Sequence, residues 1–314
     1  MKTVVLCAKK MNYDGLMDLS LLSEDVDIYD DADEEKLFDR IRDADTLVTK
    51  ENPVTRQMIE GFPDRLKLIV EAGTGYNNID IRAAKDRGIT VCNIPAYSTD
   101  SVAELAVMFV LMLSHSMGKQ IALLNKGNHS QFEDHLSVSH HEASSLTLGV
   151  IGEGRIGRKV IETAGTLGMD VLVYTRTPKE DREGVRHVSL ETLLQESDFV
   201  SLHCPLTEDT RHLIDKKALS LMKKSAYLVN TSRGALVDEE ALIEALRNRT
   251  IAGAALDVQE REPLSADSPL FTLDNVLLTP HIGWKTEEAR ERLLQILKEN
   301  IDAYREGHPV NVVN

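Results

Sequence analysis

The sequence predicts an α/β protein built from two Rossmann-like domains, each with a doubly wound parallel sheet. Short apolar runs alternate with polar, helix-like stretches along the chain, and this pattern starts again near residue 146. A glycine-rich turn follows the first strand of the second half, as in dinucleotide-binding folds. The 314 residues leave room for about two domains of typical size.

The first hundred residues predict five short strands separated by helices. The strands are expected at 4–6, 26–29, 46–48, 68–70 and 90–91. Between the second and third, Leu37, Phe38 and Ile41 fall on one face of a 3.6-residue repeat with charges opposite, which predicts a surface helix over 34–42.

A longer helix is expected from Val102 to Met117. Ser101 and Glu104 have the spacing of a capping box just before it. Its middle, Leu105 to Leu113, is apolar all round, so we expect it to be covered on more than one side, by the two domains or by a second subunit.

The second half predicts six parallel strands and a final helix. The strands are expected at 148–151, 171–174, 199–202, 226–229, 253–258 and 276–279, and the helices at 156–167, 190–195, 215–222, 238–247 and 286–304. Residues 127–145 are polar and predict the loop that enters this domain. The last helix and the tail follow the complete sheet, so we expect them to pack against the first domain.

Composition and charge exclude several classes of protein. The net charge of −15 opposes binding to nucleic acid. The longest uncharged apolar run, residues 105–113, is far shorter than the ~18 residues of a membrane span. The apolar stretch after Met1 is too short for a signal peptide, and three scattered cysteines support neither a disulfide framework nor a metal site. We expect a cytoplasmic protein with no metal, membrane or nucleic-acid partner.

The turn after the first strand of the second half has the dinucleotide-binding spacing Gly152-x-Gly154-x-x-Gly157, with Arg155 and Ile156 between the last two glycines. Gly152 permits the tight turn, Gly154 lets a pyrophosphate approach the backbone, and Gly157 lets the helix pack close to the strand. The helix N-terminus that follows favours an anion. These residues predict an NAD(P)H site.

The end of the next strand favours NADP over NAD. An acidic residue that binds the ribose 2′-hydroxyl is usual about 20 residues after the glycines, but Thr175, Arg176 and Thr177 stand there. The guanidinium and the hydroxyls suit a 2′-phosphate. Alternatively, Arg176 stacks on the adenine or lies on the surface.

Three segments at the carboxyl ends of predicted strands supply candidate catalytic residues. A histidine suits a proton donor for the developing alkoxide, and His281 is the candidate; Glu262 suits the carboxylate that orients its ring. Arg233 offers a fork-shaped cation for a substrate carboxylate. Each alone is an ordinary loop residue, but the ends of one sheet bring all three to the same edge.

These segments resemble the D-isomer-specific 2-hydroxyacid dehydrogenase family. The resemblance covers nearly the whole chain, through residues 71–80, 93–104, the glycine turn, 203–207 and the three segments that carry Arg233, Glu262 and His281. It implies that Arg233 binds the substrate, that Glu262 orients the histidine, and that His281 is the acid/base. It also implies that Asp257 holds the nicotinamide carboxamide, and that further residues line the cofactor cleft: Thr99, His203, Cys204, Pro205, Thr207, Thr231, Ser232 and Gly283.

The resemblance also implies a substrate site in the first domain. The N–H groups of Thr74 and Gly75 are expected to hold the substrate carboxylate, and Asn52 and Tyr76 to border its side chain. Trp284 walls the pocket or packs at a domain interface. Within the family, residues 97–104 and 281–290 look most like glycerate dehydrogenases, that is, hydroxypyruvate and glyoxylate reductases.

The architecture implied is a flavodoxin-like substrate domain, 1–98 plus 287–314, with the cofactor domain, 99–286, inserted into it. A homodimer through the helix region 99–117 is implied as well. D-3-phosphoglycerate, D-lactate and branched-chain 2-hydroxy acids remain as substrate alternatives, and a dinucleotide-sensing co-repressor-like protein as an alternative class. His129 departs from the tryptophan of many relatives, and we expect this to affect packing only.

Overall fold

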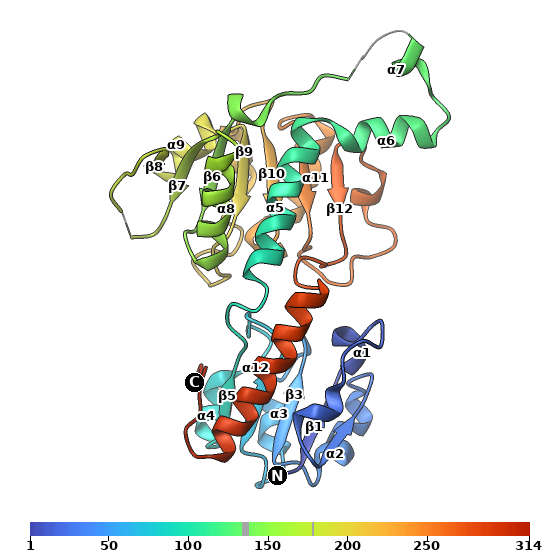
Figure 1. Cartoon of the computed structure of the whole chain (residues 1–314), viewed down its shortest axis with the longest axis vertical. Coiled ribbons are helices and arrows are strands. Elements are labelled where there is room, and N and C mark those ends of the chain that lie inside the picture. Colours follow the sequence, from blue (N-terminus) through green and yellow to red (C-terminus); the bar gives the residue numbers. More distant parts are fainter. Residues whose placement is uncertain (134–137, 178) are drawn as a thin grey trace. The chain divides into compact units, whose positions relative to one another are not determined.

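The computed structural model describes residues 1–133, 138–177 and 179–314 (Figure 1). Contacts divide the chain into two units, Met1–Ser98 with Trp284–Asn314, and Thr99–Gly283. The sequence placed the return to the first unit at residue 287, three residues later than these contacts do. Trp284 already packs within the first unit, because its ring contacts Lys50 and Tyr97.

The first unit has a five-stranded parallel sheet. Its strands are β1 (Thr3–Val5), β2 (Val26–Ile28), β3 (Thr46–Thr49), β4 (Leu68–Glu71) and β5 (Thr90–Cys92), in the order β2-β1-β3-β4-β5. This is the flavodoxin-like order, so the fold class expected for this part is confirmed.

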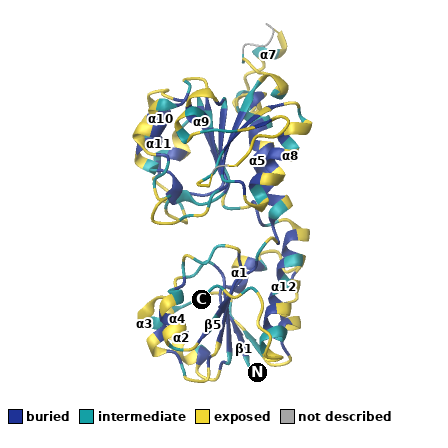
Figure 2. Cartoon of the chain, turned by 90° about the vertical axis from the view of Figure 1, so that its left-hand side faces the viewer, coloured by how far each residue is buried: buried dark blue, intermediate teal, exposed yellow. Residues whose placement is uncertain are grey.

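Helices cover both faces of this sheet. One layer contains α1 (Ala8–Met11), the 3₁₀ helix η1 (Leu19–Leu22) and the C-terminal helix α12 (Glu287–Arg305). The other contains α2 (Glu34–Ile41), α3 (Arg56–Gly61) and α4 (Ile81–Asp86) (Figure 2). Leu293, Leu297 and Ile301 of α12 are fully buried in the first layer, as expected for a helix that returns to this domain.

The second unit has a seven-stranded parallel sheet. Its strands are β6 (Thr147–Ile151), β7 (Asp170–Tyr174), β8 (Val185–His187), β9 (Phe199–Leu202), β10 (Tyr227–Asn230), β11 (Gly253–Leu256) and β12 (Val276–Leu278). The order β12-β11-β10-β9-β6-β7-β8 is that of a Rossmann sheet extended by one strand, and it reverses between β6 and β9.

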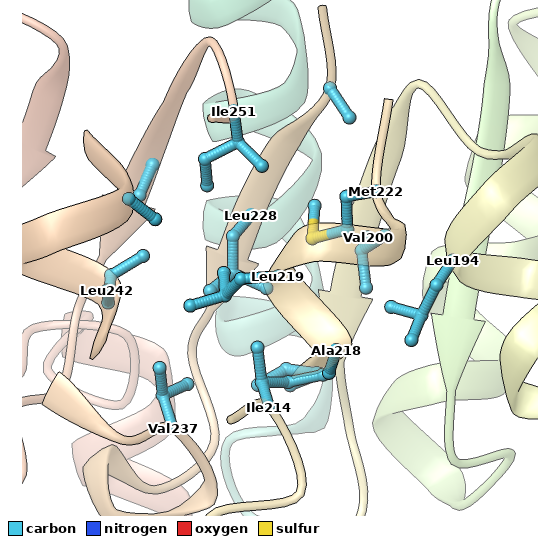
Figure 3. Close-up of a cluster of buried hydrophobic side chains, with 14 of the residues drawn as sticks. Leu194, Val200, Ile214, Ala218, Leu219, Met222, Leu228, Val237, Leu242 and Ile251 are labelled. Carbon is cyan, nitrogen blue, oxygen red and sulfur yellow. The ribbon is translucent and has the colours of Figure 1, made fainter. Parts of the chain in front are cut away.

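This sheet also lies between two helical layers. On one face, α5 (Thr99–Ser114) and α8 (Arg155–Thr166) bury an apolar cluster. On the other, α9 (Leu190–Glu196), α10 (Lys216–Leu221) and α11 (Glu239–Arg247) cover a second cluster, in which Leu219 and Met222 lie near Leu228 of β10 and Val200 of β9 (Figure 3).

The sequence missed some elements. It predicted six strands here and not β8, an edge strand of three residues. The helix expected to reach Met117 ends at Ser114, because Ser116 takes a left-handed conformation and α6 (Met117–Asn125) continues at a bend of 68°. Within the polar connection expected over 127–145 lie α7 (Ser130–Glu133) and the 3₁₀ helix η2 (Ala143–Ser145), while 134–137 lie outside the described residues. Two further 3₁₀ helices are η3 (Gly234–Leu236) and η4 (Pro269–Thr272).

No single helix in the described ranges is long and apolar enough to cross a membrane, although α5 and α6 together meet the length and composition as a bent pair.

Candidate active site

The glycine turn after β6 fits a closely approaching ligand. Gly152 has a φ of 101°, and a Cβ there would lie 2.6 Å from the Cys204 nitrogen. A Cβ on Gly157 would lie 2.1 Å from the Gly152 carbonyl oxygen, so α8 packs as closely as the sequence predicted. Gly154 is the N-cap of α8 and has open space around it. The backbone therefore forms a cradle in front of a helix N-terminus.

Glu153, between the first two glycines, is the centre of an ion cluster that sequence reasoning missed. Its side chain is only 2% exposed and contacts Lys179 Nζ and Arg182 Nη1, each at 2.7 Å, and His187 Nε2 at 3.2 Å. Burial alone would raise the pKa of Glu153, but these bonds lower it to about 2. The carboxylate thus ties the β7–β8 connection to the glycine turn. The signal in the sequence that could have predicted this cluster is a carboxylate inside the glycine motif together with basic residues after β7.

The residues expected to select the coenzyme follow β7. The Thr175 hydroxyl donates to the Thr177 carbonyl at 2.6 Å, which forms a small turn. Arg176 is exposed and has no carboxylate partner among the described residues. Lys179 and Arg182 are bonded to Glu153, whereas Arg176 is not engaged in this ion cluster.

On the other side of the topological switch point, β9 leads into His203 and Cys204. His203 Nε2 lies 2.8 Å from the Ser201 hydroxyl, and burial lowers the pKa of its ring to about 4. Burial also raises the pKa of the Cys204 thiol to about 11, so the thiol stays protonated. The next turn is fixed by Thr210, whose hydroxyl donates to the Pro205 carbonyl and accepts from the Thr207 N–H, each at 2.7 Å.

The next three strands end level with one another. Asn230 of β10 pairs in register with Leu256 of β11, and Leu256 pairs with Leu278 of β12. The segments that follow therefore leave the same edge of the sheet, as the sequence predicted.

After β10, the Asn230 side chain stabilises the turn that carries Arg233. Its amide donates to the Arg233 carbonyl at 2.9 Å and its oxygen accepts from the Ser232 N–H at 3.0 Å. The Thr231 hydroxyl is buried and has no hydrogen-bond partner among the described residues, which leaves it for a ligand. A Cβ on Gly234 would lie 1.9 Å from the Gln259 carbonyl carbon, so only glycine lets the two loops meet.

Asp257, after β11, fixes the turn that contains His281. One of its carboxylate oxygens accepts from the Thr279 hydroxyl at 2.6 Å and the Ile282 N–H at 2.8 Å, and the other accepts from the Gly283 N–H at 2.9 Å. The His281 N–H donates to the Asp257 carbonyl at 2.8 Å. The structure thus gives this buried carboxylate a positioning role that the sequence had not suggested.

His281 and Glu262 form the pair that the sequence expected. Glu262 Oε2 lies 2.8 Å from His281 Nδ1, and the other carboxylate oxygen accepts from the Gln259 N–H at 3.1 Å. The histidine side chain is 19% exposed, so a ligand can reach the ring while Glu262 holds it in place. With Nδ1 bonded to a carboxylate, Nε2 is the atom free to exchange a proton.

The residues expected to bind the substrate lie in the first unit, after β3 and β4. The Thr74 and Gly75 N–H groups donate to no acceptor in the described part of the chain. The loop is fixed around them, since Asn93 donates to the Thr74 carbonyl at 2.8 Å. Asn52 is half-buried, and its carbonyl accepts from Asn78 at 2.8 Å.

Tyr76 and Trp284 complete this group of residues. Tyr76 is half-buried, and its carbonyl accepts from the Ile79 N–H. Trp284 is 4% exposed and lies in the apolar cluster of α12. Thr99, another predicted cofactor residue, begins α5 of the second unit. The predicted site residues thus fall into two groups, each at the carboxyl edge of its own sheet or beside it.

No group of three or more potential metal ligands occurs within the described ranges.

Comparison with protein families and curated proteins gives consistent matches. Residues 107–283 match the family described as "D-isomer specific 2-hydroxyacid dehydrogenase, NAD binding domain". A glyoxylate reductase of Thermococcus litoralis is 43% identical over 88% of this chain and 86% of its own length. A hydroxypyruvate reductase of Blautia hydrogenotrophica is 37% identical over 90% of this chain and 89% of its own.

Solved structures of similar fold cover nearly the whole chain. A D-lactate dehydrogenase from Aquifex aeolicus, complexed with NAD and lactic acid, has a TM-score of 0.87 at 32% identity, covering 98% of this chain and 96% of that one. An acyclic imino acid reductase in complex with NADPH and D-Arg has a TM-score of 0.84 at 32% identity, covering 99% and 100%.

The buried neutral His203 predicts a loss of stability in mild acid. The unfolded chain binds a proton near pH 6.5, whereas the folded chain does so only near pH 4. The free energy of unfolding should therefore fall by about 2–3 kcal/mol between pH 7 and pH 4.5 from this residue. Urea unfolding followed by circular dichroism at several pH values measures it.

His203→Asn should flatten that dependence, whereas His129→Asn, at an exposed position, should retain it. Equal slopes for the wild type and His203→Asn would contradict a neutral buried imidazole.

Proposed function

The chain belongs to the D-isomer-specific 2-hydroxyacid dehydrogenase family, and from this we propose that it reduces glyoxylate or hydroxypyruvate to the D-2-hydroxy acid with a nicotinamide coenzyme. The observation that carries the proposal is the 2.8 Å contact between His281 and Glu262 at the carboxyl edge of the larger sheet. Relatives named glyoxylate reductase or hydroxypyruvate reductase, 37–43% identical over most of the chain, support the choice of substrate.

The second unit fits a nicotinamide dinucleotide. A Cβ at Gly152 or Gly157 would collide with backbone, so only glycines allow this tight turn. The turn and the helix N-terminus behind it form the cradle that a pyrophosphate needs. Arg155 and Ile156 begin the helix behind it, and the Thr231 hydroxyl, which has no partner in the described part of the chain, adds a donor next to Ser232. The bound coenzyme supplies a hydride to the substrate carbonyl. Asp257, Gly283 and the turns at Thr99 and at 203–207 would line the rest of its site.

The chain's own residues supply binding and the proton. The Arg233 guanidinium binds the substrate carboxylate and polarises the carbonyl. His281 Nε2 holds the proton that the carbonyl oxygen receives as it becomes a hydroxyl. Glu262 fixes the orientation of the ring through Nδ1. In the direction of oxidation, His281 removes the same proton.

The first unit would bind the acid end of the substrate. Thr74 and Gly75 offer two N–H groups that meet no acceptor among residues 1–133, 138–177 and 179–314, and these suit a carboxylate. Asn52, Tyr76 and Trp284 would limit the size of the side chain at C3.

Two observations favour a small uncharged substituent over the phosphate of 3-phosphoglycerate. Lys50 is buried and bonded to Glu51, and Arg56 faces Glu60, Asp80 and Asp86. Lys50 and Arg56 are thus both paired with carboxylates, which disfavours a phosphate at either of them.

The first test is the initial rate of coenzyme oxidation with glyoxylate, hydroxypyruvate, pyruvate and a branched 2-keto acid. We expect hydroxypyruvate or glyoxylate to react fastest. His281→Gln should lower kcat at least about 100-fold, since it removes the proton donor. His308→Gln, at an exposed position, is the control and should keep the wild-type rate. Binding of coenzyme without turnover of any keto acid would contradict the enzymatic proposal and favour the sensor.

We propose that NADPH is preferred over NADH, with Thr175, Arg176 and Thr177 around the 2′-phosphate. Arg176→Ala should weaken NADPH binding about 10- to 100-fold and leave NADH nearly unchanged, because the lost hydrogen bonds are to a charged group. Fluorescence titration of the reduced coenzymes measures both affinities without turnover. Arg247→Ala, an exposed arginine of α11, is the control. A parallel loss for both coenzymes would contradict a contact with the 2′-phosphate.

We also propose a homodimer through the region of α5 and α6, in the cytoplasm. An apolar groove of about 640 Å³ lies along these helices, lined in part by Val107, Met108, Leu111, Met112 and Met117. Two of these methionines, Met108 and Met117, are each 44% exposed. The cytoplasmic location is supported by three free cysteines.

Light scattering should give twice the chain mass of 35.0 kDa for the wild type. Met108→Lys should yield the single-chain mass, because a charge would be buried at the contact. Phe271→Lys, at a position 57% exposed elsewhere on the unit, should remain dimeric. A wild type with the mass of one chain at micromolar concentration would overturn the proposed dimer.

A further inference from the structure

A buried charge cluster lies beneath the loop of Thr74 and Gly75, and the mechanism above does not use it. Lys50 follows β3 directly and is 2% exposed, and Glu71 is the last residue of β4 and is fully buried. β3 and β4 are adjacent, so both groups lie at the carboxyl edge of the smaller sheet. Buried charges are costly, so a fold that keeps them without need is uncommon.

The cluster connects the segments around the predicted substrate site. Glu71 Oε1 accepts from the Glu51 N–H at 2.9 Å, and Oε2 accepts from Asn78 at 2.8 Å. The same Asn78 amide donates to the Asn52 carbonyl. The Lys50 ammonium bonds Glu51 Oε1 at 2.9 Å and stands 4.0 Å from the centre of the Trp284 ring.

The ammonium lies directly under the loop. A Cβ built on Gly73 would be 3.2 Å from Lys50 Nζ and 3.5 Å from Glu71 Oε1. The next two residues are Thr74 and Gly75, whose N–H groups have no acceptor in the described part of the chain. The Trp284 Nε1 is also buried and has no acceptor among the residues that the structure describes. Unpartnered donors beside a buried cation favour an anion.

We propose that Lys50 is an electrostatic positioning residue, which strengthens the binding of the substrate carboxylate at Thr74 and Gly75 from beneath the loop, and that Glu71 sets the size of this effect through its charge. The inference rests on the proposed function, since it takes that loop as the carboxylate site. Lys50 does not touch the substrate, so its effect appears in binding rather than in the proton transfer.

The cations and anions around the cluster determine its charge. Burial alone would lower the pKa of Lys50, but Tyr97, Glu51 and Glu71 offset this and hold it above its ordinary value. Burial raises the pKa of Glu71 to about 7, although Lys50 and the bonds from Asn78 and Glu51 lower it.

Other ionisable groups also face the cluster. Lys10 donates to the Glu51 carbonyl, Lys285 faces the Trp284 ring, and the buried Cys7 thiol is near Glu71. Burial raises the pKa of this thiol, so it stays neutral near pH 7.

With a pKa of about 7, Glu71 loses its proton progressively between pH 6 and pH 8.5. While Glu71 is neutral, Lys50 and Glu51 together have no net charge. Once Glu71 is ionised, the three groups together have one net negative charge. The carboxylate of the substrate should then bind more weakly, so KM for the keto acid should rise about three- to fivefold between pH 6 and pH 8.5, while kcat at saturation follows the acid/base group.

The test compares Lys50→Met, Lys50→Arg, Glu71→Gln and the double variant Lys50→Met/Glu71→Gln. Lys50→Met should raise KM for glyoxylate about tenfold with kcat and the coenzyme Kd unchanged, and Lys50→Arg should restore most of the affinity. Glu71→Gln should remove the rise in KM above pH 7. The double variant avoids an unpaired buried carboxylate, so it should fold even where Lys50→Met does not, and it should keep the higher KM.

The control is Lys67→Met, which removes an exposed lysine next to the amino end of β4 and should change nothing. An unchanged KM in both variants that lack Lys50, or a tenfold loss of kcat with KM unchanged, would overturn the proposal. So would a rise in KM between pH 6 and pH 8.5 that persists in Glu71→Gln.

A second readout separates this inference from the proposed activity. Trp284 is the only tryptophan, so its emission reports on the cluster directly. Binding of oxalate, a carboxylate that is not reduced, should quench this emission with a Kd about tenfold weaker in Lys50→Met. If no keto acid is turned over but oxalate binding still depends on Lys50, the proposed activity is rejected and the carboxylate site is supported. If turnover is normal and oxalate binds equally well to the wild type and to Lys50→Met, only the proposed role of Lys50 is rejected.

Discussion

Parallel strands all point one way, and this constraint determines where the chemistry of this protein lies. Every strand within the described parts of both sheets pairs in parallel with its neighbours, so all the loops that follow strands emerge at one edge of each sheet. The glycine turn, Arg233, Glu262 and His281 share the edge of the larger sheet, although more than a hundred residues separate the first from the last. Lys50, Glu71 and the loop above them share the edge of the smaller one.

Within the larger unit, carboxylates perform three different tasks. Asp257 is buried and bonded to the turn around His281, so it determines where the imidazole stands. Glu262 bonds the ring itself through Nδ1 and orients it. Glu153 is far from the proton transfer in sequence and binds three basic side chains at the glycine turn. The surroundings of each carboxylate, rather than its chemical type, determine which task it performs.

The sequence predicted the repeated βα pattern, the glycine turn and the His281–Glu262 pair, because periodicity and strand-end position are local properties. It missed β8 since a three-residue edge strand has too few positions to show a pattern, and it missed the break after α5 because Ser116 departs from the helix in a left-handed conformation. It also missed the Lys50–Glu71 cluster. The approach of two charged residues about twenty positions apart depends on the pairing of β3 with β4, which no local pattern contains.

The anchoring of the β7–β8 connection by Glu153 has a consequence for evolution and engineering. The ion cluster holds this connection through Lys179 and Arg182, whereas Thr175 and Arg176, for which we propose the contact with the ribose, take no part in it. Mutations in that stretch can accumulate without loosening the connection. A few substitutions after β7 can therefore change the preference between NADH and NADPH, while the Glu153 ion cluster that holds the β7–β8 connection stays intact.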